Sequence, residues 1–199
     1  MGRLPVVSSH PDPASTPSGQ HNAVRSTPPL LPGPRLRLRP GVPADAALLH
    51  QIRNQPSVSR WWGRADPEDE IAAELRGESE EVLLVIEVDG EVAGSIQYVE
   101  ENEPDHRHAG IDIYLSDRFQ GRGLGTEAVA VLAAYLIDER GHHRLTIDPA
   151  VANVGAIRSY EKVGFRPVGV MRQYERAPDG TWHDGLLMDL LAAELIRAG

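Results

Sequence analysis

Three glycines at alternate positions, Gly121, Gly123 and Gly125, lie directly after an apolar segment and directly before an apolar helical pattern. A strand, a glycine-rich loop and a helix in that order leave backbone N–H groups free at the positive end of the helix dipole, where phosphate oxygens bind. Arg122 can add charge-assisted hydrogen bonds to the same anion. No Gly-Lys-Ser/Thr follows, which argues against a P-loop. The loop from Gln120 to Thr126 therefore predicts a diphosphate site, although a lone glycine triplet can equally serve only a tight turn.

A second motif follows about 30 residues later and supports the diphosphate interpretation. Gln120-x-x-Gly123-x-Gly125 resembles the diphosphate-binding signature of the GNAT superfamily of acyl-CoA N-acyltransferases, and residues 153–165 resemble its second signature. The resemblance implies that acetyl-CoA, as co-substrate, lies in a wedge where the strands expected at 109–115 and 143–148 splay apart. It implies cofactor contacts from Tyr114, Leu115, Gln120, Gly121, Arg122, Gly123, Leu124, Gly125, Thr126 and Asn153. Asn153 has a second explanation as a helix N-cap.

Four further segments resemble the aminoglycoside 6'-N-acetyltransferases within that superfamily: Trp61-Trp62-Gly63, Gly110-Ile111-Asp112, Asp148-Pro149 and residues 156–162. The resemblance implies that Asp112 receives the proton of the acceptor amine and that Tyr160 protonates the departing thiolate. It also implies a sugar pocket lined by Trp62, Gln97, Tyr98, Asp112, Asp148 and Asp179. For Asp179 an ordinary turn is the competing interpretation, because Pro178-Asp179-Gly180 is a common turn sequence.

The chemistry of amine acylation asks for these residue types independently. An alkyl amine with a pKa of roughly 8 to 10 arrives protonated, and only the neutral amine attacks a thioester, so a carboxylate must take the proton. Asp112 lies in the strand next to the expected wedge, but it shares an alternate strand face with Gly110 and Tyr114, so a solvent-facing role stays open. Tyr160 can serve as the acid or as a core anchor. A backbone N–H near Leu115 suits the oxyanion.

The overall charge favours a cationic partner. There are 29 acidic and 20 basic residues, a formal charge of −9, which disfavours nucleic acid. Two acidic runs, at 66–81 and 100–105, are either solvated faces or the mouth of a site for a cationic small molecule. The absence of cysteine excludes disulfides, thiolate zinc sites and cysteine nucleophiles. The scattered histidines suggest no metal, and no segment has the length of a membrane span, so we expect a cytoplasmic monomer or homodimer.

The periodicity of the chain predicts the elements that position these residues. Asp89-Gly90 between two apolar runs is a strong hairpin signal. We expect strands at 35–39, 81–88, 91–99, 109–115, 143–148, 166–176 and 184–191, and helices beginning near Pro43, at Asp66, at Leu124 and at Asn153. This order predicts an α/β (α+β) class, a GNAT-like three-layer fold in which a mixed, mostly antiparallel central sheet with splayed strands carries helices on both faces.

The first 34 residues differ in composition from the rest. Eight of the 16 prolines fall there, among Ser, Thr, His and Gly with few periodic apolar residues. Such a segment cannot bury enough surface to order itself. We expect a disordered tail over 1–34 and one catalytic domain over 35–199.

Three functions remain open from the sequence. The first is acetylation of the 6'-amine of an aminoglycoside, which confers antibiotic resistance. The second is acylation of another polar amine, such as a siderophore precursor of the hydroxylysine type or a polyamine. The third, from another class, is a module that binds acyl-CoA without catalysis.

Overall fold

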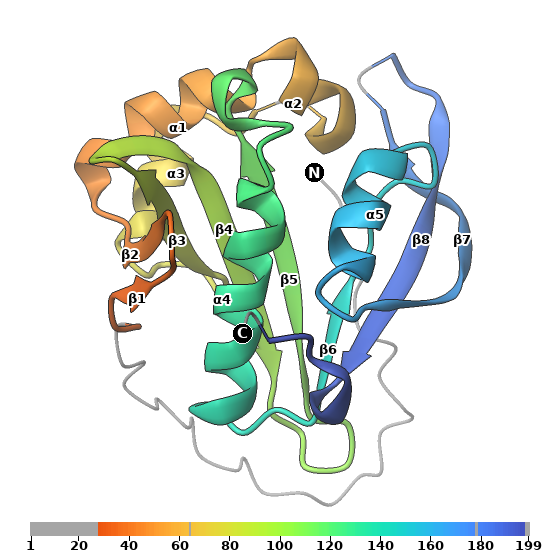
Figure 1. The fold of residues 1–199 in the computed structure, drawn as a ribbon. Helices are drawn as coiled ribbons and strands as arrows, with labels where there is room; N and C mark the ends of the chain where they lie inside the picture. Colours follow the sequence, from red (N-terminus) through yellow and green to blue (C-terminus); the bar gives the residue numbers. More distant parts are fainter. Residues whose placement is uncertain (1–27, 64, 178, 198–199) are drawn as a thin grey trace, which may run out of the picture.

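An eight-stranded sheet in the order β1-β2-β3-β4-β5-β6-β8-β7 runs through the computed structural model, which describes residues 28–63, 65–177 and 179–197 (Figure 1). Its strands are β1 Leu31–Pro32, β2 Arg37–Pro40, β3 Val82–Val88, β4 Glu91–Glu101, β5 His108–Leu115, β6 Arg144–Ile147, β7 Arg166–Arg176 and β8 Trp182–Leu191. The helices are α1 Ala46–Arg53, α2 Pro56–Trp62, α3 Glu68–Leu75, α4 Leu124–Asp138 and α5 Val154–Glu161, with 3-10 turns η1 Pro43–Asp45, η2 Asp117–Phe119 and η3 Ala192–Glu194. The predicted mixed, mostly antiparallel sheet is confirmed.

Helices cover both faces of the sheet, which accounts for the almost continuous apolar run of β3. Leu84 and Ile86 belong to the large core that includes α4, whereas Leu83 and Val85 belong to a second core with α1, α2 and α3. Successive side chains of a strand point to opposite faces, so a strand buried on both sides needs apolar residues throughout. The predicted three-layer arrangement is therefore confirmed.

The sheet opens between β5 and β6, as Figure 1 shows. These two parallel strands pair only at Ala109↔Leu145 and Gly110↔Thr146, although β5 continues to Leu115 and stays paired with β4 throughout. The second half of β5 therefore presents one backbone edge that no strand covers. This opening is the splayed wedge that the sequence predicted.

The N-terminal end differs from the expectations in two respects. Helix α2 was not among the expected helices; it begins at Pro56, because proline fits the first helical position, where its missing N–H costs nothing. The domain also begins earlier than Arg35, because Leu31 pairs with Leu38 and lies in the main core. Most of the expected tail, residues 1–27, lies outside the described residues. Among the described residues, no helix is long and apolar enough to cross a lipid bilayer.

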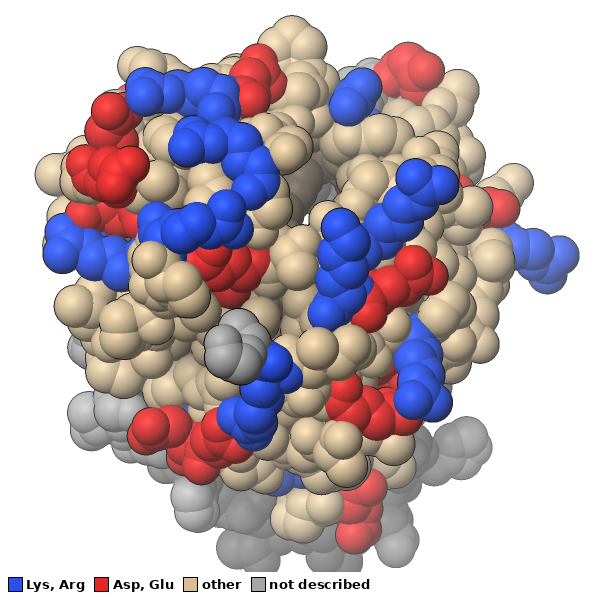
Figure 2. Space-filling model, in the orientation of Figure 1, with Lys and Arg blue, Asp and Glu red and all other residues tan. Residues whose placement is uncertain are grey.

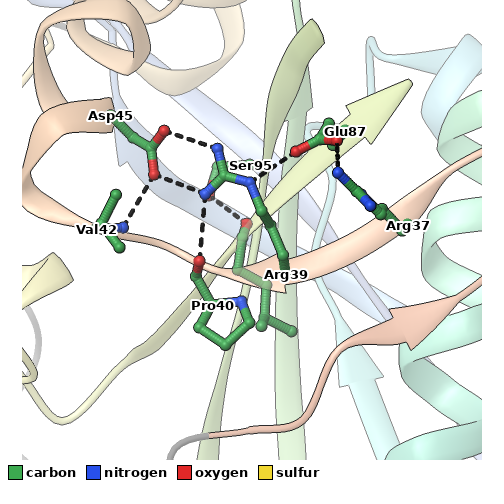
Figure 3. A network of polar contacts seen from close by, with 8 residues as sticks. Arg37, Arg39, Pro40, Val42, Asp45, Glu87 and Ser95 are labelled. Carbon is green, nitrogen blue, oxygen red and sulfur yellow. Dashed lines mark hydrogen bonds and ion pairs between the residues drawn. The ribbon is translucent and has the colours of Figure 1, made fainter. Parts of the chain in front are cut away.

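A network of ion pairs fastens the N-terminal helical layer to the sheet (Figure 3). Arg39 on β2 donates to both carboxylate oxygens of Asp45, at 2.7 and 2.8 Å, and to Glu87 on β3 at 2.8 Å. Arg37 contacts the other oxygen of Glu87, and Val42 N–H donates to Asp45 at 2.9 Å. Both carboxylates are buried. Arg39 thus links β3 to the turn from which α1 and α2 follow.

Replacing Arg39 by Ala leaves two buried carboxylates without their shared partner. Breaking a buried ion pair costs about 3–5 kcal/mol. Because the Arg39 side chain is 22% exposed, we expect Arg39→Ala to lower the free energy of unfolding, measured in urea, by roughly 2–3 kcal/mol. The control is Arg76→Ala, whose fully exposed pair with Glu78 should contribute little to stability because water screens it. Equal losses in the two variants would contradict a structural role for the network.

The same network predicts loss of stability in acid. Hydrogen bonds from Arg39 lower the pKa of Asp45, and at Glu87 burial raises the pKa but the bonds from Arg39 and Arg37 outweigh it. Because both folded-state pKa values lie below their unfolded values of 3.8 and 4.5, the stabilisation is present above that range and is lost as the pH falls through the folded-state values. Urea unfolding between about pH 3 and pH 7 should show this dependence, with a shallower slope in Arg39→Ala. A slope unchanged by that substitution would place the acid-sensitive groups elsewhere.

Candidate active site

A cavity of about 730 Å³ occupies the opening between β5 and β6. Residues from α2, β5, the glycine-rich loop, the segment after β6, α5 and β7 line it. It brings together twelve of the predicted site residues: Trp62, Asp112, Tyr114, Leu115, Gln120, Gly121, Gly123, Gly125, Thr126, Asp148, Asn153 and Tyr160. One cavity thus joins the predicted diphosphate loop to the predicted catalytic groups.

The glycine-rich loop has the backbone of an anion site. Gly121 and Gly123 have φ angles of +69° and +77°, which side chains with a Cβ rarely adopt, and Gly123 is the N-cap of α4. The first intrahelical bond runs from Glu127 N–H to Gly123. The N–H groups of the first helical turn, including Gly125, precede that bond and have no intrahelical acceptor. Leu124 can contribute only its backbone, because its side chain is buried in the main core.

The two long polar side chains of the loop, Gln120 and Arg122, occupy different positions. The amide of Gln120 donates to the Leu115 carbonyl at 2.7 Å and to Ser57 Oγ at 3.1 Å, so it braces the loop against β5 and α2. Arg122 is exposed, lies outside the cavity lining and holds its guanidinium 5.7 Å from the Phe119 ring. Lys162 of the opposite wall does line the cavity. Figure 2 shows Lys and Arg side chains on both sides of a hollow on this face, a charge pattern suited to phosphates.

The free edge of β5 is formed by Ile113 and Leu115, which corrects the expected role of Tyr114. The Tyr114 carbonyl faces Gly94 of β4, and Ser116 N–H donates to Ala93 next to it. Because backbone groups alternate along a strand, the N–H groups of Ile113 and Leu115 point away from β4 into the opening. Their carbonyls accept from Trp62 Nε1 at 3.2 Å and from Gln120 at 2.7 Å.

Tyr114 serves instead as a packing residue. Its ring is buried in the second core and meets the Trp62 ring edge to face, with centroids 5.1 Å apart. The Arg53 guanidinium lies 4.5 Å from the Trp62 ring centre and 5.4 Å from that of Tyr114. This stack sets the position of Trp62, whose partly buried side chain forms one wall of the cavity together with Trp61.

Asn153, which we expected from the sequence to contact the cofactor, also belongs to the cavity lining. Its side-chain oxygen accepts from Ala156 N–H at 3.2 Å, the N-cap bond that the sequence suggested. The structural role is therefore confirmed, and a cofactor contact stays a prediction.

Three polar groups lie close together in the cavity. Asp112 on β5 is exposed to it, Asp148 follows β6, and Tyr160 reaches it from α5. Burial raises the pKa of the Tyr160 hydroxyl, and the negative charges of Asp112 and Asp148 raise it further. Tyr160 therefore stays protonated at neutral pH and can donate a proton or a hydrogen bond. Burial also raises the pKa of Asp148, and a hydrogen bond from Tyr174 partly offsets this effect.

Two cavity residues on β7 escaped the sequence reasoning. Tyr174 and Glu175 belong to the lining, beside Asp148. Burial raises the pKa of Glu175, the nearby charge of Asp148 raises it further, and His183 and Arg53 act in the opposite direction. Only the β7–β8 pairing, which is irregular between Met171 and Glu175, brings both residues to the site.

Three expected pocket residues lie elsewhere. Tyr98 is buried in the main core with its ring against Tyr135 of α4, so its expected contact with a sugar is wrong. Gln97 lies opposite Asp112 in the sheet but outside the cavity lining, and its amide donates to Glu81 at 3.1 Å. Asp179 is exposed and accepts from Thr181 N–H and Oγ1 at 2.9 and 2.7 Å, which is the turn interpretation.

Comparison with known proteins agrees with this geometry. The family model described as "Acetyltransferase (GNAT) domain" matches residues 35–166. Spermidine N(1)-acetyltransferase of Escherichia coli K12 is 31% identical over 159 residues, covering 77% of this chain and 84% of that protein. Aminoglycoside N(6')-acetyltransferase type 1 of Klebsiella pneumoniae is 30% identical over 153 residues, covering 68% and 74%.

Solved structures resemble the fold over most of its length. Mycobacterium smegmatis RimJ in complex with CoA-disulfide superposes with a TM-score of 0.72 at 26% identity, covering 82% of this chain and 85% of that one. The structure of AAC(6')-Ib in complex with paromomycin and acetyl-CoA gives a TM-score of 0.67 at 26% identity, covering 82% and 98%. Two neighbours, one solved with CoA-disulfide and one with acetyl-CoA, thus share this arrangement of sheet and helices.

Proposed function

The chain belongs to the acetyltransferase (GNAT) family, whose members transfer acetyl groups from acetyl-CoA to amines, and from that premise we propose its acceptor and the roles of its residues. The acceptor is a primary amine of a cationic small molecule, with the 6'-amino group of an aminoglycoside as the first candidate. One observation carries the proposal: a single cavity is lined both by the glycine-rich loop and by Asp112, Asp148 and Tyr160.

The donor binds along the opening in the sheet. The loop amides from Gly121 to Thr126 hold the diphosphate, and the free β5 edge at Ile113 and Leu115 pairs with the amide groups of the pantetheine arm. Basic side chains on the rim, Lys162 among them, favour the phosphates although the whole chain is acidic.

The acetyl group moves by direct transfer within a ternary complex. Asp112 takes a proton from the acceptor ammonium, and the neutral nitrogen attacks the thioester carbonyl carbon. The Leu115 N–H stabilises the oxyanion of the tetrahedral intermediate. As the carbon–sulfur bond breaks, Tyr160 donates its proton to the CoA sulfur, and the proton that the nitrogen still has to lose returns the Tyr160 phenolate to its neutral form. The neutral amide and free CoA thiol leave, and Asp112 releases its proton to water.

The acceptor end attracts a polycation. Asp112, Asp148 and Glu175 supply carboxylates, and the Trp61 and Trp62 rings suit a sugar ring or an alkylammonium group. The relative with the larger shared length is a spermidine acetyltransferase, so a polyamine is the second candidate. A siderophore precursor of the hydroxylysine type is a further possible acceptor.

Release of free thiol from acetyl-CoA tests the proposal, with kanamycin, spermidine and N6-hydroxylysine offered separately. Turnover with kanamycin supports the first candidate, and turnover only with spermidine or hydroxylysine replaces it. Saturable binding of acetyl-CoA without turnover of any amine would favour a binding module without catalysis.

A further inference from the structure

Strand β7 contains a bulge directly beside the acceptor end of the cavity. The pairing with β8 shifts once between Pro167 and Gly169, runs on to Met171↔Gly185 and resumes at Glu175↔His183, so three residues of β7 lie opposite the single Asp184 of β8. Gln173, within the bulge, has a φ of +51°, a conformation in which a residue with a Cβ is strained. Bulges next to active sites commonly redirect a side chain.

Two contacts hold the bulge in place. The Gln173 N–H donates to Asp184 Oδ1 at 2.8 Å, so a β8 side chain satisfies the backbone group that the bulge releases. Gly185, the next residue on β8, lies under the Tyr174 ring. A Cβ at Gly185 would stand 2.8 Å from Tyr174 Cδ1 and 3.2 Å from Met171 Cε, so only glycine leaves room for the ring in this position.

The same glycine connects the bulge to the Asp148 segment. Gly185 forms an isolated bridge with Ala150, and Leu186 N–H donates to the Pro149 carbonyl at 2.8 Å. The Tyr174 ring is thereby placed beside Asp148, close enough for its hydroxyl to lower the pKa of that carboxyl as a hydrogen-bond donor, against the raising effect of burial. Both side chains line the cavity.

We propose that Tyr174 is a positioning residue for the acceptor: its hydroxyl orients the Asp148 carboxyl toward the second amine of a diamine or polyamine acceptor, and the β7 bulge exists to place it there. The inference rests on the proposed function. A carboxyl without this donor turns freely, so a bound ammonium group loses part of its fixed acceptor geometry. The reacting amine lies at Asp112, so the chemical step itself is spared.

The test compares Tyr174→Phe with the wild-type enzyme, using whichever of kanamycin and spermidine the wild type acetylates. Loss of the hydroxyl should raise the KM for that amine roughly 5- to 20-fold, less than the full loss of a hydrogen bond to a charged group, because Asp148 itself remains. The value of kcat, the KM for acetyl-CoA and the melting temperature should stay near those of the wild type. An unchanged amine KM, or an equal change in the acetyl-CoA KM, would overturn the inference.

Two further variants test the bulge. Gly185→Ala should raise the amine KM in the wild-type background by displacing the Tyr174 ring, but should add nothing in a Tyr174→Ala background. Gln173→Gly is the matched control, because glycine accepts the positive φ and should leave the amine KM unchanged. If Gly185→Ala raised the amine KM by the same factor in the Tyr174→Ala background as in the wild type, the role assigned to the bulge would be overturned. If the wild type acetylates neither amine, the proposed function fails first and this inference falls with it.

Discussion

Asp112→Asn is expected to lower kcat by roughly 10²- to 10⁴-fold, the usual contribution of a positioned general base. The amide keeps the size of the side chain but cannot take the proton from the acceptor ammonium. Binding of acetyl-CoA, measured by calorimetry, should change little, because Asp112 belongs to β5 and not to the glycine-rich loop that we propose holds the diphosphate. A higher pH should restore part of the rate, since an amine with a pKa of roughly 8 to 10 then deprotonates in solution.

Asp105→Asn is the control for this experiment. It removes the same charge from an exposed position outside the cavity and should leave kcat unchanged. An Asp112→Asn enzyme with the wild-type rate at every pH would show that another group handles the proton.

Gly125→Ala is expected to weaken acetyl-CoA binding roughly 10- to 100-fold while leaving the fold intact, as for about 1–3 kcal/mol of overpacking. Within the protein the added Cβ would stand 3.5 Å from Leu115 Cδ1, an ordinary contact, and Gly125 has no positive φ. Alanine also favours a helix by up to about 1 kcal/mol over glycine. The methyl group would instead occupy cavity space next to the amides proposed to hold the diphosphate.

Titration calorimetry with acetyl-CoA and urea unfolding measure the two effects separately. Gly169→Ala is the matched control, because Gly169 on β7 has open space around its Cβ and lies outside the cavity lining. Acetyl-CoA binding of Gly125→Ala as tight as that of the wild type would place the diphosphate elsewhere.

The locally encoded features of the fold were predictable from the sequence. Asp89-Gly90 sets the β3–β4 hairpin because both residues adopt the positive φ that such a turn needs. Gly121 and Gly123 open α4, and Asn153 caps α5, because each requirement is met by the residue itself and its next few neighbours. The two signature motifs therefore located most of one cavity wall.

The misplaced residues depended on strand faces and on register. Gln97 and Tyr98 are adjacent in β4, so they point to opposite faces and could not both line one pocket. Backbone groups alternate too, so Tyr114 and Leu115 could not share one free edge, and the pairing with β4 decides that the edge belongs to Ile113 and Leu115. The residue types were suitable for the site, but the prediction did not take account of which face or edge of the strand each residue occupies.

The sequence by itself determined the order of elements, the hairpin, the glycine-rich loop proposed to hold the diphosphate, and the residue types of an amine-acylating site. These features follow from backbone preferences over a few neighbouring residues. The tertiary structure alone decided that α2 braces Gln120 through Ser57 and that the β7 bulge brings Tyr174 to Asp148. Those contacts join segments far apart in the chain, and their geometry depends on how every intervening element packs.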